Sequence, residues 1–114
     1  MNDSTTPPEA AFHLLLDTPE VPVTASALRL LIADEAHQPE IRGLAREVLA
    51  ELEGEPDEFG VLSVALTQGQ LKITPTAVHL LLDDLQRGQN DERQVLHAIL
   101  GKLPDEHAIR AIQL

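Results

Sequence analysis

Two histidine–aspartate pairs have the residue types and spacing closest to metal chemistry. His13 and Asp17 are four residues apart, as are His79 and Asp83, and both pairs occur in the sequence His-Leu-Leu-Leu-Asp. On a helix, residues four apart share a face, and imidazole and carboxylate groups both ligate zinc. Two such helices in contact would form a divalent-metal site. The favoured alternative is a pair of weak surface hydrogen bonds, so we expect no bound metal and no cofactor.

The sequence contains no recognisable catalytic motif. There is no Cys, which excludes thiolate nucleophiles, thiolate metal sites and disulfides. Phosphate-binding Gly-rich loops, Gly-x-Ser-x-Gly elbows and His-Glu-x-x-His helices do not occur. We therefore expect a non-enzymatic protein.

The densest charge feature is a run of six carboxylates within twelve residues. The chain has 8 Lys and Arg against 19 Asp and Glu, giving a formal net charge of −11. Such a field repels phosphate backbones and anionic lipid and attracts basic surfaces, so we expect no direct nucleic-acid or membrane binding. The run predicts a docking surface for another protein with a basic surface. It consists of Glu47, Glu51, Glu53, Glu55, Asp57 and Glu58.

Two alternatives to this docking surface remain. The carboxylates are also typical of a solvated helix end and loop with no partner. They also suit an inhibitor or immunity-type protein that imitates DNA phosphates and neutralises a nuclease or toxin.

Composition places these residues in one small domain. A chain of 114 residues is one ordinary domain. Hydrophobic residues make up 43% but aromatic residues only 2%, so the core must be aliphatic, which suits helix-on-helix packing. No apolar run reaches the roughly 18 residues of a membrane span, and residues 1–8 lack the basic start of a secretory signal. We expect a cytoplasmic protein with a flexible lead at 1–6 and a single helical domain at 7–114.

Similar segments recur along the chain. Residues 23–32 match residues 73–82 at an offset of 50, and Pro-Asp-Glu at 56–58 matches Pro-Asp-Glu at 104–106 at an offset of 48. Recurrence at such a period is typical of a repeat architecture. It predicts an all-α, α-solenoid-like protein with units at about 21–66 and 71–114.

The opening segment completes this scheme as a partial N-terminal unit, with a short helix from residue 7 or 8 to Asp17. Thr24 and Thr74 are predicted to cap the first helix of each full unit. Helices starting near Pro39 and Asn90 are expected to follow, and further helices after 56–58 and 104–106. A second interpretation keeps a β-hairpin at 61–73, because apolar and polar residues alternate there.

One segment resembles a known repeat family. Residues 34–52 have an acidic turn, a Pro39-Glu40-Ile41-Arg42 start and Ala and Leu at helical spacing, similar to the turn and second helix of a HEAT repeat. The period of 47–50 residues suits a three-helix, armadillo-like unit. The resemblance implies stacked helices and, by analogy alone, a binding function.

The end of the chain offers a second contact surface. Helical stacks expose an apolar face at each terminus unless a cap covers it, and residues 108–114 are mostly apolar. This segment either packs on the core or forms a homodimer contact with a second copy.

Overall fold

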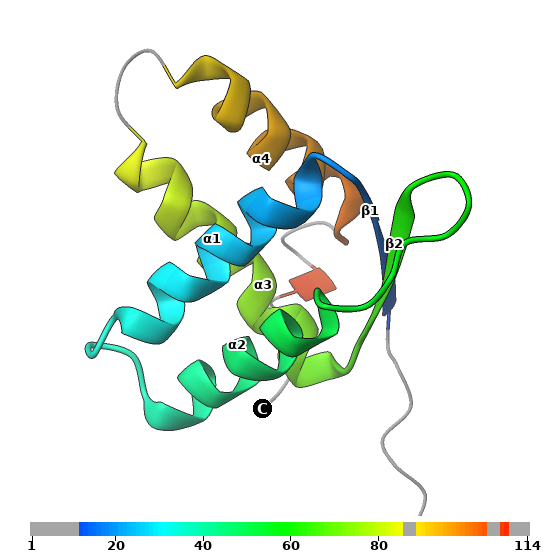
Figure 1. Ribbon diagram of the computed structural model, residues 1–114. Helices are drawn as coiled ribbons and strands as arrows, with labels where there is room; N and C mark the ends of the chain where they lie inside the picture. The colour runs from blue at the N-terminus through cyan, green and yellow to red at the C-terminus, as the bar shows by residue number, and fades with distance from the viewer. Residues whose placement is uncertain (1–11, 86–88, 105–107, 110–114) are drawn as a thin grey trace, which may run out of the picture.

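The protein is a mixed α/β globule, so the expectation of an all-α, α-solenoid-like repeat is wrong. The computed structural model describes residues 12–85, 89–104 and 108–109. A strand followed by two helices occurs, and the same order then occurs again (Figure 1). The elements are β1 (Phe12–Asp17), α1 (Glu20–Ala33), α2 (Pro39–Glu51), β2 (Val61–Leu66), α3 (Gln68–Asp84) and α4 (Asn90–Lys102).

The two strands form an antiparallel ribbon although 43 residues separate them in the chain. Phe12 lies opposite Leu66 and Asp17 opposite Val61, and the residues between them pair in the same register, with Leu14 opposite Val64. The four helices lie to one side of the ribbon (Figure 1). The hairpin expected at 61–73 is therefore wrong, because β2 pairs with β1 and residues 71–73 belong to α3.

The segment 12–17 is a strand rather than the end of a helix. Leu14 and Leu16 are buried, whereas His13, Leu15 and Asp17 are exposed, which is the period of two of a half-buried strand. Three consecutive leucines conceal this period in the sequence. Pairing with β2 decides between the two conformations, because strand preference depends on cross-strand neighbours.

Helices α1 and α3 begin earlier than predicted. Thr67 caps α3: its hydroxyl accepts from the backbone N–H of Gln70, and the Gln70 side chain accepts from the backbone N–H of Thr67. The predicted caps Thr24 and Thr74 are instead buried inside their helices, four and six residues after the first helical residue. Their hydroxyls donate to the carbonyl oxygens of Glu20 and Gln70, each at 2.8 Å.

Helices α2 and α4 start where the sequence predicted, at Pro39 and Asn90. The HEAT-like segment therefore does contain a helix. It does not stack in a solenoid, because α2 packs against α1 and α3 and also contacts β2. The predicted helix start at 56–58 is wrong, since these residues form a turn before β2.

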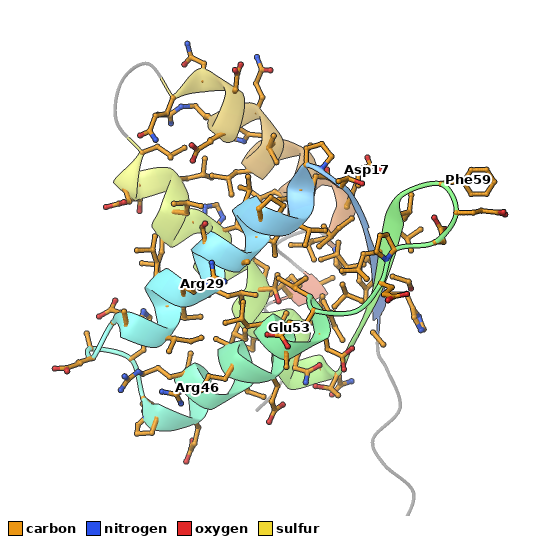
Figure 2. The ribbon with its side chains drawn as sticks, viewed as in Figure 1. Asp17, Arg29, Arg46, Glu53 and Phe59 are labelled. Carbon is orange, nitrogen blue, oxygen red and sulfur yellow. The ribbon has the colours of Figure 1, made fainter. Side chains whose placement is uncertain are left out.

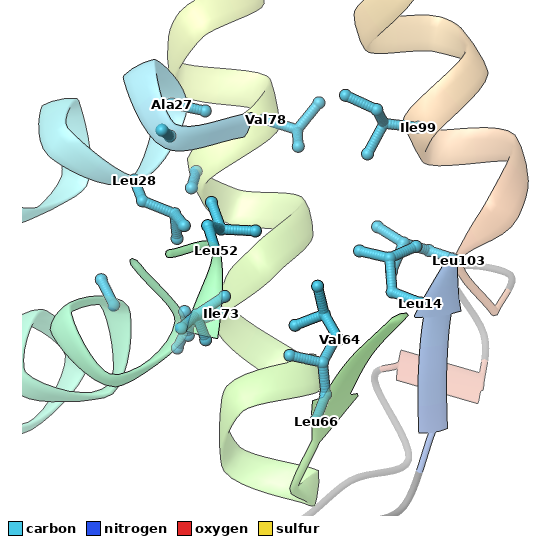
Figure 3. Packing of buried hydrophobic residues seen from close by; sticks show 14 of the residues in the cluster. Leu14, Ala27, Leu28, Leu52, Val64, Leu66, Ile73, Val78, Ile99 and Leu103 are labelled. Atoms are coloured by element: carbon cyan, nitrogen blue, oxygen red, sulfur yellow. The ribbon is translucent and has the colours of Figure 1, made fainter. Parts of the chain in front are cut away.

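An aliphatic core joins the helices to the inner face of the ribbon (Figure 3). Leu14 and Val64 from the strands meet Val78 of α3 and Ile99 of α4, all essentially without solvent exposure. Helices α1 and α3 pack against each other behind the ribbon. The expectation of an aliphatic core is confirmed.

Residues 50 apart occupy matching places in the two strand–helix–helix halves. Glu20 and Gln70 are both buried in the first turn of a helix, and each accepts a hydrogen bond from the backbone N–H three residues earlier. The halves thus correspond to residues 12–51 and 61–102, rather than to the predicted units at 21–66 and 71–114.

Two further expectations concern the membrane and the chain end. Among the described residues, no helix is long and apolar enough to cross a membrane. The predicted C-terminal helix and its homodimer contact fall largely outside the described part of the chain.

Candidate functional site

The acidic run lies on the last turns of α2 and on the loop that joins α2 to β2, residues 52–60 (Figure 1). In Figure 2 this loop extends beyond the body of the molecule, and Phe59 points away from it. Sequence analysis predicted six partner-binding carboxylates here. All six are exposed, and two of them, Glu47 and Asp57, also accept hydrogen bonds from within the protein.

Asp57 organises the loop into a fixed turn. Its Oδ1 accepts hydrogen bonds from the backbone N–H groups of Phe59 at 2.8 Å and Val61 at 3.0 Å. Its own backbone N–H donates to the carbonyl of Val61, and its carbonyl accepts from the N–H of Gly60. Gly60 has φ of +79° and its carbonyl accepts from the Thr18 hydroxyl at 2.9 Å. Asp57 therefore fixes the shape of the turn through Oδ1, while its side chain remains exposed.

Glu47 also has an internal partner. Its Oε1 accepts a hydrogen bond from Gln70 Nε2 at 2.9 Å, which ties α2 to the first turn of α3. The remaining four carboxylates are exposed, and within the described residues their side chains form no hydrogen bond or ion pair: Glu51, Glu53, Glu55 and Glu58. These four are the part of the predicted site that is available to a partner.

Phe59 is the feature of this site that the sequence interpretation missed. Its side chain is 82% exposed, and it follows Glu58 directly at the tip of the turn. An isolated aromatic residue inside a polar, acidic segment was the available signal. The chain has only two Phe and no Trp or Tyr, so one of its few aromatic side chains is displayed to solvent.

An ion pair between a buried carboxylate and a half-buried lysine lies beside the ribbon. Glu20 is only 6% exposed, and its Oε1 lies 2.6 Å from the backbone nitrogen of Asp17 and 2.5 Å from Lys102 Nζ. Lys102 also contacts the Leu15 carbonyl at 3.0 Å and the Asp17 carboxylate at 3.4 Å. Burial by itself would lower the pKa of Lys102, but the hydrogen bond and charge of Glu20, with the charge of Asp17, outweigh burial and raise this pKa above its usual value. The cluster fastens α4 to β1 and α1.

The two histidine–aspartate pairs do not have the expected arrangement. His13 and Asp17 lie on strand β1, not on a helix, and Asp17 is paired with Lys102. His79 and Asp83 lie on α3 as expected. No group of three or more potential ligand side chains comes close enough to hold a metal ion anywhere in the described ranges.

The chain matches no family model, no curated protein and no solved structure. The site therefore has to be interpreted from its own chemistry. In the described part of the chain it offers a fixed turn that carries exposed carboxylates and an exposed aromatic ring, and that leads into a two-stranded ribbon with one solvent-exposed face.

Proposed function

We propose that this protein is a non-enzymatic interaction module whose acidic loop binds the basic surface of another protein. The observation that carries the proposal is the set of free, exposed carboxylates on the 52–60 loop and the end of α2. Clustered charge of one sign speeds association with a partner of opposite sign. Because Asp57 and Gly60 fix the turn, little loop ordering is needed on binding.

Charge also argues against nucleic acid as the partner. Some DNA-binding proteins insert a two-stranded ribbon into the major groove, so the shape of this fold alone would permit that function. Neither strand contributes Lys or Arg to the outer face of this ribbon, and Lys102 of α4, which borders it, is paired with Asp17 and Glu20. A net charge of −11 opposes the phosphate contacts on which DNA affinity depends. The outer-face residues are His13, Leu15, Asp17, Val61, Ser63 and Ala65.

The proposal is tested by affinity capture from the source lysate at low salt, with elution by a salt gradient. The test variant is Glu53→Gln/Glu55→Gln/Glu58→Gln, which leaves the structural residues Glu47 and Asp57 unchanged.

The matched control is Glu35→Gln/Asp83→Asn/Asp84→Asn, which changes net charge equally at exposed positions. Glu35 lies in the connection between α1 and α2, and Asp83 and Asp84 are the last two residues of α3, so none of them belongs to the ribbon or to the 52–60 loop.

The expected result is one dominant basic protein that the wild type and the control retain and the test variant loses. Equal losses from both variants would show that retention depends on net charge alone and would contradict a localised site. If the captured protein is a nuclease or toxin, measuring its activity with and without this chain distinguishes an inhibitor from a passive docking module.

A further inference from the structure

The outer face of the β1–β2 ribbon has no layer of structure packed on it within the described part of the chain. The inner face is covered by the helices, and its leucines and valine are buried. The outer face carries Leu15, 52% exposed, together with the partly exposed Val61 and the exposed Ala65. In a two-layer domain, the solvated face of a sheet normally carries polar residues, so this apolar content requires an explanation.

Phe59 is a second exposed apolar side chain, on the loop that leads into β2. Leu15 and Phe59 are the two large hydrophobic side chains that are exposed among the described residues. Leu15 lies opposite Ser63 on the ribbon, and Phe59 precedes Val61, the first residue of β2, by two positions. A shallow depression of about 410 Å³ lies on this face, lined by His13, Leu15, Asp17, Val61 and Lys102. An exposed apolar surface with charged residues at its border is typical of an interaction site.

We propose that the outer face of the ribbon, with Phe59 as its anchor, docks an apolar patch bordered by Lys and Arg on the partner protein. This inference rests on the proposed function and specifies the chemistry of the partner. The charge of the residues that border this face indicates which kind of partner binds it. Glu53, Glu55 and Glu58 lie on the loop that carries Phe59, so a basic border would pair with them, whereas a second copy of this chain would bring like charges together.

Phe59 has the properties of an interface hot spot. Aromatic side chains that enter a pocket on the partner dominate many interfaces, and a phenyl ring loses little conformational freedom when it is buried. The Asp57 turn holds its backbone in place before binding.

The test uses two synthetic peptides of equal charge. The first is an amphipathic helical peptide of Lys and Leu, and the second replaces each Leu with Ser. Affinities are measured by isothermal titration calorimetry for the wild type, Phe59→Ser, Leu15→Ser and Glu53→Gln/Glu55→Gln/Glu58→Gln. Because both apolar positions are exposed, these variants are expected to melt as the wild type does, which circular dichroism checks.

The expected result is that the wild type binds the Lys/Leu peptide at least about tenfold more tightly than the Lys/Ser peptide. Phe59→Ser should remove most of this difference and leave the affinity for the Lys/Ser peptide unchanged. Leu15→Ser should reduce the difference by a smaller factor, and the triple Glu→Gln variant should weaken the binding of both peptides.

Failure of this inference is distinguishable from failure of the proposed function. If both peptides bind equally well, in a salt-sensitive manner that the triple variant abolishes, the apolar docking surface is refuted and the charge-based function stands. If neither peptide binds, both are refuted. Sedimentation equilibrium of the chain alone gives a further check, because a dimer that Phe59→Ser dissociates would identify a second copy as the occupant and overturn the proposal.

Discussion

We expect substitution of Lys102 to destabilise the fold, because it removes the positive charge that is paired with Glu20. In Lys102→Met, the Glu20 carboxylate remains buried with the backbone N–H of Asp17 as its one described hydrogen-bond donor. Removing one partner of a fully buried ion pair costs about 3–5 kcal/mol. The Lys102 side chain is itself 33% exposed, so the pair is partly solvated and the expected loss is smaller. We expect Lys102→Met to lower the free energy of unfolding by about 2–3 kcal/mol.

The residue that matches Glu20 in the second half suggests a change that would offset this loss of stability. There the buried residue is Gln70, a neutral amide that accepts from the N–H of Thr67 as Glu20 accepts from that of Asp17. Glu20→Gln should therefore cost only about 1–2 kcal/mol, because it keeps the backbone hydrogen bond and loses the charge. The double variant Glu20→Gln/Lys102→Met should be more stable than the sum of the two losses implies, by about 1–2 kcal/mol.

Urea denaturation followed by far-ultraviolet circular dichroism measures these free energies, since the chain has no Trp or Tyr for fluorescence. Arg46→Met is the control for loss of one positive charge, because Arg46 is exposed and no hydrogen bond or ion pair of its side chain was found within the described residues. It should change stability by less than about 0.5 kcal/mol. An unchanged midpoint for Lys102→Met, or strictly additive losses in the double variant, would refute the buried-pair argument.

Three other outcomes are expected. The pKa of Lys102 is raised in the folded state, so the stability that its charge contributes is complete below the unfolded pKa of about 10.4 and is lost as the pH rises through the higher folded pKa. Thermal melts should therefore show an alkaline loss of stability that Lys102→Met lacks. Gly60→Ala should cost about 1–2 kcal/mol in urea titrations, because φ is +79° and the new Cβ would lie 3.0 Å from Thr18 Oγ1; a neutral result would contradict the turn geometry. Leu14→Ala should cost about 2–5 kcal/mol and Leu15→Ala less than about 0.5, and equal losses would contradict the alternation of β1.

Local signals predicted α2 and α4 well. Pro39 fits the first helical turn, and the apolar residues after it keep helical spacing, so little tertiary information was needed. The starts of α1 and α3 were misplaced because Thr24 and Thr74 have the residue type of a cap. A threonine hydroxyl can equally donate to a carbonyl one turn earlier inside a helix, which both do here. The better signal was the capping box from Thr67 to Gln70.

Strand β1 depends on contacts that the local sequence does not carry. Leu14, Leu15 and Leu16 suit a helix and a strand alike, and only a partner about 50 residues away decides the conformation. The acidic run was recognisable from the sequence, and its role as a docking site stays a prediction. The internal hydrogen bonds of Glu47 and Asp57 and the exposure of Phe59 could not be predicted, because they follow from a contact to α3, from the geometry of one turn and from the position of its tip.

The pairing of β1 with β2 joins the two halves of the chain and therefore affects how the protein unfolds. In a solenoid each repeat contacts only its neighbours, so terminal repeats can unfold while the others remain. Here each half supplies one strand whose ladder partner lies in the other half, and Glu47 and Lys102 each reach across to the first helix of the opposite half. Once one half unfolds, the other retains neither a paired strand nor the polar contacts that link the halves. The chain therefore behaves as one cooperative unit, and its population is divided between fully folded and fully unfolded molecules.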